Sequence, residues 1–162
     1  MGALGEVKIV GRGETAFELR RLSEEERGLL RGLPSLVRAL LSDDDREDPA
    51  LRRLFPSAFM DDATLSEDFD RMVRDDLVHQ RLAALETMEA SIDEERLTQE
   101  QAEAWLASIN DVRLILGVRL AVSEESTPED FAEDEGKRGA FAVYLYLGFL
   151  EEHVVTALAG AV

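Results

Sequence analysis

Hydrophobic and polar residues alternate near the start of the chain, which is the pattern of a half-buried β-strand. Val7 and Ile9 precede the glycine-containing segment GRG, and Phe17 and Leu19 follow it at the same two-residue spacing. A short segment of this kind between two such runs is typical of a hairpin turn. We therefore predict a β-hairpin over residues 7–20, which must pack against helices or a second copy because an isolated hairpin is marginally stable.

The next hundred residues have apolar positions at three- and four-residue intervals, as on one face of an α-helix. Pro34 lacks a backbone donor and predicts a break or kink of the helix near Gly32-Leu33. Three Ser/Thr-x-x-Glu/Gln signatures, in which two side chains satisfy the first backbone N–H groups of a helix, predict helix N-termini. These signatures are Ser23–Glu26, Thr64–Glu67 and Thr98–Gln101.

The helix expected after Thr98 is the most apolar of these. On a helical wheel five of its residues form one continuous stripe: Trp105, Ile109, Val112, Leu116 and Leu120. Beyond Asp111, apolar residues also face away from this stripe. A helix that is apolar on all sides is usually buried, so we expect the second half of this helix to be enclosed.

Polar groups interrupt this apolar helix at Asn110, Asp111 and Arg113. Breaking a buried ion pair costs about 3–5 kcal/mol, so a buried Arg113 must have an acidic partner. The candidate acids on other helices are Asp75, Asp76, Glu151 and Glu152, and we favour the Asp75–Asp76 pair because its surroundings, RMVRDDLV, are otherwise apolar. We interpret five residues as an internal polar lock that fixes helix register: Asn110, Asp111, Arg113, Asp75 and Asp76. A binding role remains open if Arg113 faces a pocket.

The last helix is expected over 140–160, after an acidic linker over 123–139. Its apolar run GAFAVYLYLGFL is shorter than the roughly 20 residues of a membrane span. Gly117 and Gly148 lie in two apolar helices, which predicts a tight helix crossing where backbones approach closely. We name six residues for this crossing or for an interface: Trp105, Gly117, Tyr144, Tyr146, Gly148 and Phe149. The long helix expected after Thr64 has apolar residues on two sides, which also predicts a homodimer.

The 162 residues fit one domain, a mainly α-helical bundle of four to five helices with an N-terminal β-hairpin and a helical core over 23–122. No cysteine is present, which excludes disulfides and thiolate sites, and the start lacks the pattern of a signal peptide, so we expect a cytoplasmic protein. The net charge of −17 disfavours nucleic acid and favours a basic protein surface as the partner. We expect no membrane contact.

Enzymatic signatures are weak. His79 follows Asp76 at the spacing of a helical metal motif, but His153 has Leu150 at the corresponding place. The segment GRGETA lacks the Lys-Ser/Thr of a phosphate-binding loop, and the acidic runs lack the spacing of a calcium loop. We therefore predict no catalytic, cofactor-binding or metal-binding residue and no cofactor, with a metal-binding helical enzyme as the least favoured alternative.

Three segments together resemble an actinobacterial domain-of-unknown-function family of AosR-type oxidative-stress regulators, encoded near the ClpS adaptor: EDPALRRLFPSAFMDD, LTQEQAEAWLASINDVRLILGVRLAV and FAVYLYLGFLEEHVVTAL. The resemblance covers about residues 15–160 and implies a cytosolic regulator that binds an alternative sigma factor or RNA polymerase. A Clp-linked adaptor is the alternative. If the chain is such a regulator, redox sensing in the family depends on cysteines, which are absent here. The oxidant would then be sensed by the partner or by the methionines Met60, Met72 and Met88.

The sequence thus predicts a non-enzymatic regulatory protein that acts through protein–protein contact in transcriptional control of the oxidative-stress response.

Overall fold

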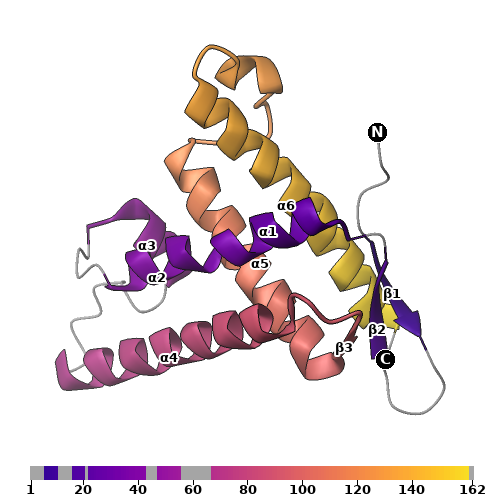
Figure 1. Ribbon diagram of the computed structural model, residues 1–162. Helices are drawn as coiled ribbons and strands as arrows, with labels where there is room; N and C mark the ends of the chain where they lie inside the picture. The colour runs from indigo at the N-terminus through magenta and orange to yellow at the C-terminus, as the bar shows by residue number, and fades with distance from the viewer. Residues whose placement is uncertain (1–5, 11–15, 21, 43–46, 56–66, 161–162) are drawn as a thin grey trace.

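The computed structural model is mainly helical, with a small sheet at one end (Figure 1). It describes residues 6–10, 16–20, 22–42, 47–55 and 67–160. The prediction of a mainly α-helical fold with an N-terminal β-hairpin is confirmed. In chain order the elements are β1 (Glu6–Val10), β2 (Ala16–Arg20), α1 (Glu24–Gly32), α2 (Pro34–Ser42), α3 (Pro49–Leu54), α4 (Glu67–Ser91), β3 (Arg96–Thr98), α5 (Gln99–Arg119), the 3-10 helix η1 (Pro128–Phe131) and α6 (Glu135–Gly160).

The sheet is antiparallel and has the strand order β1–β2–β3. Strands β1 and β2 form the predicted hairpin, with Ile9 opposite Phe17. Strand β3 was not predicted, and it pairs with the other edge of β2, where Leu97 lies opposite Phe17. Both of these side chains are fully buried. Three residues directly before a helix are too few to show the two-residue alternation from which a strand is predicted.

Two predicted helix starts are confirmed by their hydrogen bonds. At α1 the Glu26 backbone N–H donates to Ser23 Oγ at 3.1 Å, and the Ser23 N–H donates to Glu26 Oε2 at 2.8 Å. Thr98 and Gln101 form the same reciprocal pair at α5. The signature at Thr64 lies outside the described residues.

The predicted break at Pro34 is also confirmed. Helix α1 ends at Gly32, and Pro34 is the first residue of α2. Proline is tolerated at this position because the first helical N–H groups have no partner within the helix. Pro34 therefore divides one apolar stretch into two helices, α1 and α2.

The segment expected as an acidic linker is partly helical. It contains η1, and α6 begins at Glu135, five residues before the expected start at 140. The start was missed because Asp134, rather than Ser or Thr, caps this helix: its Oδ1 accepts from the Lys137 N–H at 3.1 Å. The ring of Phe131 lies 4.5 Å from that of Phe141, so η1 is packed against the first turns of α6.

The hydrophobic core receives side chains from helices α1 to α6 and from the sheet, and α5 runs through the middle of the molecule (Figure 1). Helix α5 leaves this core in its second half and rises beside the first half of α6, so that the two helices and η1 project above α1 and α2 (Figure 1). We call this projection, residues 116–146, the arm. The largest fully buried side chains of the core include Phe17, Leu30, Leu85, Met88, Ile92, Leu97, Trp105, Ile109, Leu147 and Leu150.

Among the described side chains of helix α4, the fully buried ones lie in its second half, while Leu77 and Val78 pack against the core partly buried. Leu85 and Met88 are buried, whereas Phe69 and Met72 near its start are 47% and 60% exposed. Of the methionines named as possible sensors, Met72 is therefore exposed and Met88 lies in the core, while Met60 lies outside the described residues.

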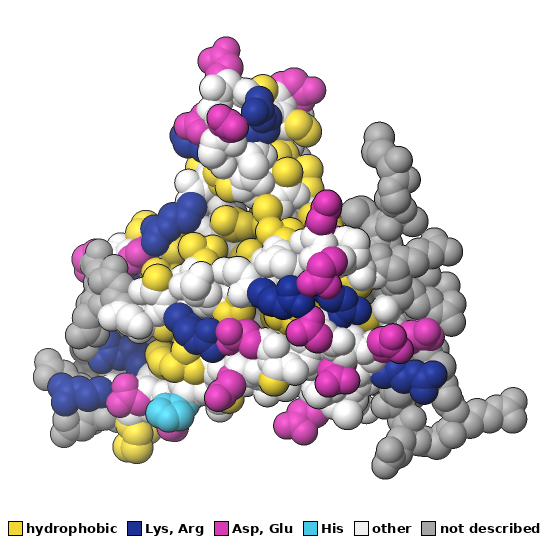
Figure 2. Space-filling model, in the orientation of Figure 1, with side chains coloured by type: hydrophobic (Ala, Val, Ile, Leu, Met, Phe, Trp, Pro, Cys, Tyr) yellow, Lys and Arg dark blue, Asp and Glu magenta, His cyan; other side chains and the backbone are white. Residues whose placement is uncertain are grey.

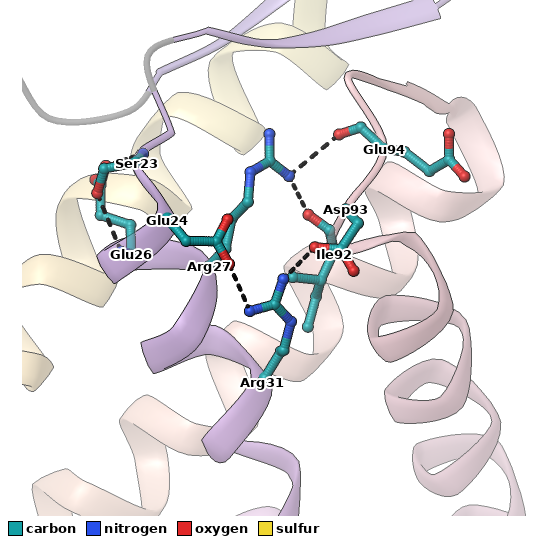
Figure 3. A network of polar contacts seen from close by, with 8 residues as sticks. All are labelled: Ser23, Glu24, Glu26, Arg27, Arg31, Ile92, Asp93 and Glu94. Atoms are coloured by element: carbon teal, nitrogen blue, oxygen red, sulfur yellow. Dashed lines mark hydrogen bonds and ion pairs between the residues drawn. The ribbon is translucent and has the colours of Figure 1, made fainter.

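Arginines of α1 fasten the end of α4 to the rest of the bundle (Figure 3). Arg27 donates to the backbone carbonyl of Ile92 and, at 3.3 Å, to that of Glu94, both in the turn that follows the end of α4. Arg31 bonds to Asp93 and also to an acid of its own helix. These contacts hold the turn that leads from α4 to β3, and β3 in turn precedes α5.

Candidate functional site

The buried carboxylate of α5 is tied to α4. Asp111 is 1% exposed, and its Oδ1 accepts a hydrogen bond from Arg81 Nη1 at 2.8 Å. Burial raises the pKa of Asp111 to about 6, although the positive charge of Arg81 lowers it in part. The Arg81 guanidinium lies 5.8 Å from the centre of the Phe55 ring, next to α3. The prediction that Asp111 belongs to an internal polar contact agrees with this arrangement.

Arg113 is paired with α6. Its Nη1 donates to Glu151 Oε2 at 2.6 Å, and its Cζ lies 4.8 Å from the centre of the Tyr144 ring. The favoured partners, Asp75 and Asp76, are wrong: both are exposed on α4. Glu151 was among the acids that the sequence left open, and it projects from α6 toward α5.

The burial of Arg113 was also overestimated. Its side chain is 30% exposed, because the second half of α5 is not enclosed. Leu114, Leu116 and Val118 are only half-buried, and Asn110 is half-buried as well. Neighbouring helices therefore cover the second half of α5 only in part.

Both predicted glycines lie between α5 and α6, but each accommodates a side chain rather than a backbone. A Cβ atom at Gly148 would lie 3.1–3.3 Å from the guanidinium of Arg113, which is tighter than ordinary contact. A Cβ atom at Gly117 would lie 3.6 Å from the Tyr144 ring. The prediction of close backbone approach at these two glycines is therefore wrong, and the space beside Gly148 holds the Arg113 guanidinium that pairs with Glu151.

A third charged contact, which the sequence did not predict, ties the end of α5 to α3. Arg119 donates from Nη1 and Nη2 to the two oxygens of Asp48, at 2.9 and 2.8 Å. Asp48 is also the N-cap of α3 and accepts from the Ala50 N–H. The hydrogen bonds from Arg119 hold the pKa of Asp48 below its usual value, against the opposing effect of burial. Asp48 followed by Pro49 is a sequence signal for the start of a helix. No sequence signal indicates that Asp48 pairs with an arginine 71 residues away.

We call these three contacts the α5 anchors: Asp111–Arg81 to α4, Arg113–Glu151 to α6, and Arg119–Asp48 to the start of α3. Each joins α5 to a different neighbour.

The predicted crossing residues divide between the core and the surface. Trp105 is fully buried and donates from Nε1 to Ser91 Oγ at 2.8 Å, which joins α5 to α4. Tyr144 and Tyr146 are half-buried, and burial together with the neighbouring Glu26 carboxylate raises the pKa of Tyr146. Phe149 is exposed and lies against the His153 ring at 4.4 Å between centres.

The exposed hydrophobic side chains are the clearest surface feature. On α6, Leu145 and Phe149 are 49% and 39% exposed, and Val155 is exposed near the end of the helix. Figure 2 shows hydrophobic side chains gathered where the arm rises above α1. By length and composition α6 could also cross a membrane, a property that core helices share; it is the one such helix in the part of the chain described.

The described part of the chain was compared with the arrangement that a metal ion needs. Within residues 6–10, 16–20, 22–42, 47–55 and 67–160, no three His, Asp or Glu side chains are placed to hold a metal ion together. His79 is exposed on α4, while His153 lies on α6 against Phe149. The arrangement is suited to positioning helices and presenting a surface.

The chain is similar to known proteins over most of its length. A family model described as "Domain of unknown function (DUF2017)" matches residues 7–158. Proteins named "Oxidative stress regulator AosR" from Mycobacterium bovis and Mycobacterium tuberculosis are 33% identical over 133 residues, and the match covers 70% of this chain and 60% of theirs. The chain thus spans about three fifths of the length of these curated relatives. No solved structure matches this chain significantly. Because the family match includes every element from the hairpin to α6, the chain belongs to the DUF2017 family.

Proposed function

We propose that this chain regulates the oxidative-stress response, and that it does so by binding another protein rather than by catalysing a reaction. The observation that carries the proposal is the 33% identity to mycobacterial proteins named oxidative stress regulators. The shared part covers 70% of this chain.

The surface supports action through protein contact. Exposed apolar side chains on the outer face of a helix, such as Leu145 and Phe149, are typical of interaction sites. The net charge of −17 would attract a basic protein surface and repel the phosphates of nucleic acid. We therefore propose a basic protein partner in the transcription machinery, either an alternative sigma factor or RNA polymerase.

The absence of cysteine shapes the mechanism that we propose. A thiol-based oxidant signal requires a thiolate, and none of the 162 residues supplies one. In our proposal the oxidant is sensed by the partner, and this chain changes what the partner does. The protein would be cytoplasmic, where such a partner is found.

The first experiment tests regulation itself. The gene is deleted in its own host, and transcripts are measured with and without peroxide. We expect a set of stress transcripts to lose its peroxide response and to regain it when the wild-type gene is returned. A deletion strain with an unchanged peroxide response would contradict the proposal.

The second experiment tests the partner. The purified chain is used as bait in host extract at low and high salt, because contacts between opposite charges weaken as salt rises. We expect a sigma factor or RNA polymerase at low salt and its loss at high salt. Recovery of Clp proteins instead would replace this partner with a role in proteolysis.

A matched pair of variants then locates the contact. Glu124→Lys/Glu125→Lys and Asp75→Lys/Asp76→Lys change the net charge equally, but the first pair lies on the arm and the second on α4. All four acids are exposed, so both variants should fold. A partner that contacts the arm is lost with the first variant and retained with the second.

A further inference from the structure

The outward face of α6 carries a continuous seam of exposed residues. Starting at Arg138, exposed positions recur at alternating steps of four and three residues, which is the spacing of residues along the contact line of a coiled coil. The seam consists of Arg138, Ala142, Leu145, Phe149, Glu152 and Thr156, and all six are exposed. Within the described chain the opposite side of α6 packs in the core through Leu147, Leu150 and Val154.

The two ends of the seam carry opposite charges. Its centre is apolar, with Ala142, Leu145 and Phe149, while Arg138 at one end is positive and Glu152 at the other is negative. Both charged residues are seven positions, or two helical turns, from Leu145. A surface with this symmetry is complementary to itself when one copy is reversed.

We propose that the α6 seam binds the α6 seam of a second copy of this chain in an antiparallel arrangement. Pairing centred on Leu145 brings Arg138 within one helical turn of Glu152 of the partner subunit, and two-fold symmetry repeats this contact at the other end. A parallel arrangement would place like charges side by side at both ends, which is unfavourable. Small Ala142 leaves space for the large ring of the partner's Phe149.

The overall charge predicts how salt affects this contact. Two chains of net charge −17 repel each other, and salt screens that repulsion, since the screening length falls from about 10 Å at 0.1 M to about 3 Å at 1 M. Exposed ion pairs such as those between Arg138 and Glu152 contribute at most about 1 kcal/mol each. We therefore expect the dimer to tighten as salt rises, whereas a basic partner is released. The inference draws on the same exposed residues, Leu145 and Phe149, as the proposed protein contact, and measuring mass and transcripts separately distinguishes failure of one from failure of the other.

The test is the mass of the purified chain by sedimentation equilibrium across a range of concentration and salt. We expect a concentration-dependent dimer for the wild type and at least about a tenfold weaker association for Leu145→Asp, which would bury an unpaired charge. Leu145 is exposed, so this variant should keep the wild-type helix content. Met72→Asp is the matched control, because Met72 is at least as exposed but lies on α4.

Charge reversal tests the direction. Arg138→Glu and Glu152→Arg should each weaken the dimer, and the double variant should restore it, because only the antiparallel arrangement pairs these two positions. A wild-type chain that is monomeric at high concentration and high salt overturns the proposal. Equal weakening by Met72→Asp, or failure of the double variant to restore association, also overturns it. So does a monomer that binds phosphatidylcholine vesicles through Leu145.

Discussion

The first half of α5 lies inside the core, whereas the second half runs along α6, and of its apolar side chains only Val112 and Ile115 are buried. Trp105 and Ile109 in the first half are fully buried, and Leu114, Leu116 and Val118 in the second half are not. All three α5 anchors begin at or beyond Asp111. Buried apolar area holds the first half without regard to direction, and directional charge contacts fix the position of the second.

The first half of α5 therefore contributes mainly to stability, and the second half mainly to the relative positions of the helices. Apolar burial is roughly proportional to area and should supply most of the free energy of folding. Ion pairs at partly exposed sites contribute less, but they specify which residue of α5 lies beside which residue of its neighbours. Variants in the two halves should therefore differ in size of effect and in kind.

The largest effect is expected in the core half. Trp105→Ala should lower the free energy of unfolding by about 3–5 kcal/mol, because it leaves a cavity and removes the hydrogen bond to Ser91. Leu116→Ala on the arm is the control and should cost less than half as much, since Leu116 is only half-buried. Urea titration followed by circular dichroism measures both. Equal losses would show that the two halves are held in the same way.

The next effect is a pH dependence at the boundary between the halves. The pKa of Asp111 rises from 3.8 to about 6 on folding, so the folded state holds an extra proton between these values. The stability that this proton supplies is complete below about pH 4 and is lost as the pH rises through about 6. The pKa change corresponds to at most about 3 kcal/mol, at about 1.4 kcal/mol for each unit.

The measurement is the difference in unfolding free energy between wild type and Asp111→Asn from pH 4 to pH 7. We expect wild type to lose stability relative to the variant as the pH rises. Arg81→Met should move the upper end of this window above pH 6, because Arg81 lowers the pKa of its partner. A flat difference would show that Asp111 is more hydrated than its burial indicates.

Local signals in the sequence predicted much of this fold. The capping residues Ser23 and Thr98 and the break at Pro34 act within a few residues of themselves, so their effects can be read from spacing. Trp105 was placed in the core because its stripe is continuous. The same reasoning overestimated the burial of the second half of α5, because periodicity shows that a face is apolar and not how many neighbours cover it.

Contacts between distant segments could not be predicted in the same way. Four acids were compatible with Arg113, and helical spacing does not determine which helix lies beside α5. Arg119 and Asp48 are 71 residues apart, and no local pattern joins them. The family resemblance was predicted correctly because it depends on residue identities along most of the chain.

A moderate effect is expected at the anchor between α5 and α6. Arg113→Ala should cost about 1–3 kcal/mol by leaving Glu151 unpaired, and it should not unfold the protein, because Arg113 is itself partly exposed. Arg113→Lys is the control: it keeps the charge but loses the planar group over Tyr144. Thermal unfolding measures stability, and hydrogen exchange of α6 reports whether the arm loosens locally. Complete unfolding would mean that the arm is part of the core.

The smallest effect is expected where α5 ends in the arm. Ala121 has a positive φ of 52°. The backbone N–H groups of Ala121 and Val122 donate to the carbonyl oxygens of Val118 and Gly117, a pair of hydrogen bonds that closes many helices. The left-handed conformation costs a residue with a Cβ about 1–2 kcal/mol, and glycine avoids that cost. Ala121→Gly should therefore stabilise the protein, by less than about 1 kcal/mol once the greater freedom of glycine in the unfolded chain is included.

Ala132→Gly is the matched control for this stabilisation. Ala132 is also an exposed alanine of the arm, but its φ of −66° is ordinary for any residue. Glycine relieves no strain there and only adds freedom to the unfolded chain, so this variant should be destabilised by a similar small amount. Opposite signs for the two alanines, measured by thermal unfolding, would show that the end of α5 is fixed by backbone geometry as well as by Arg119. The same sign at both positions would show that Ala121 is not strained.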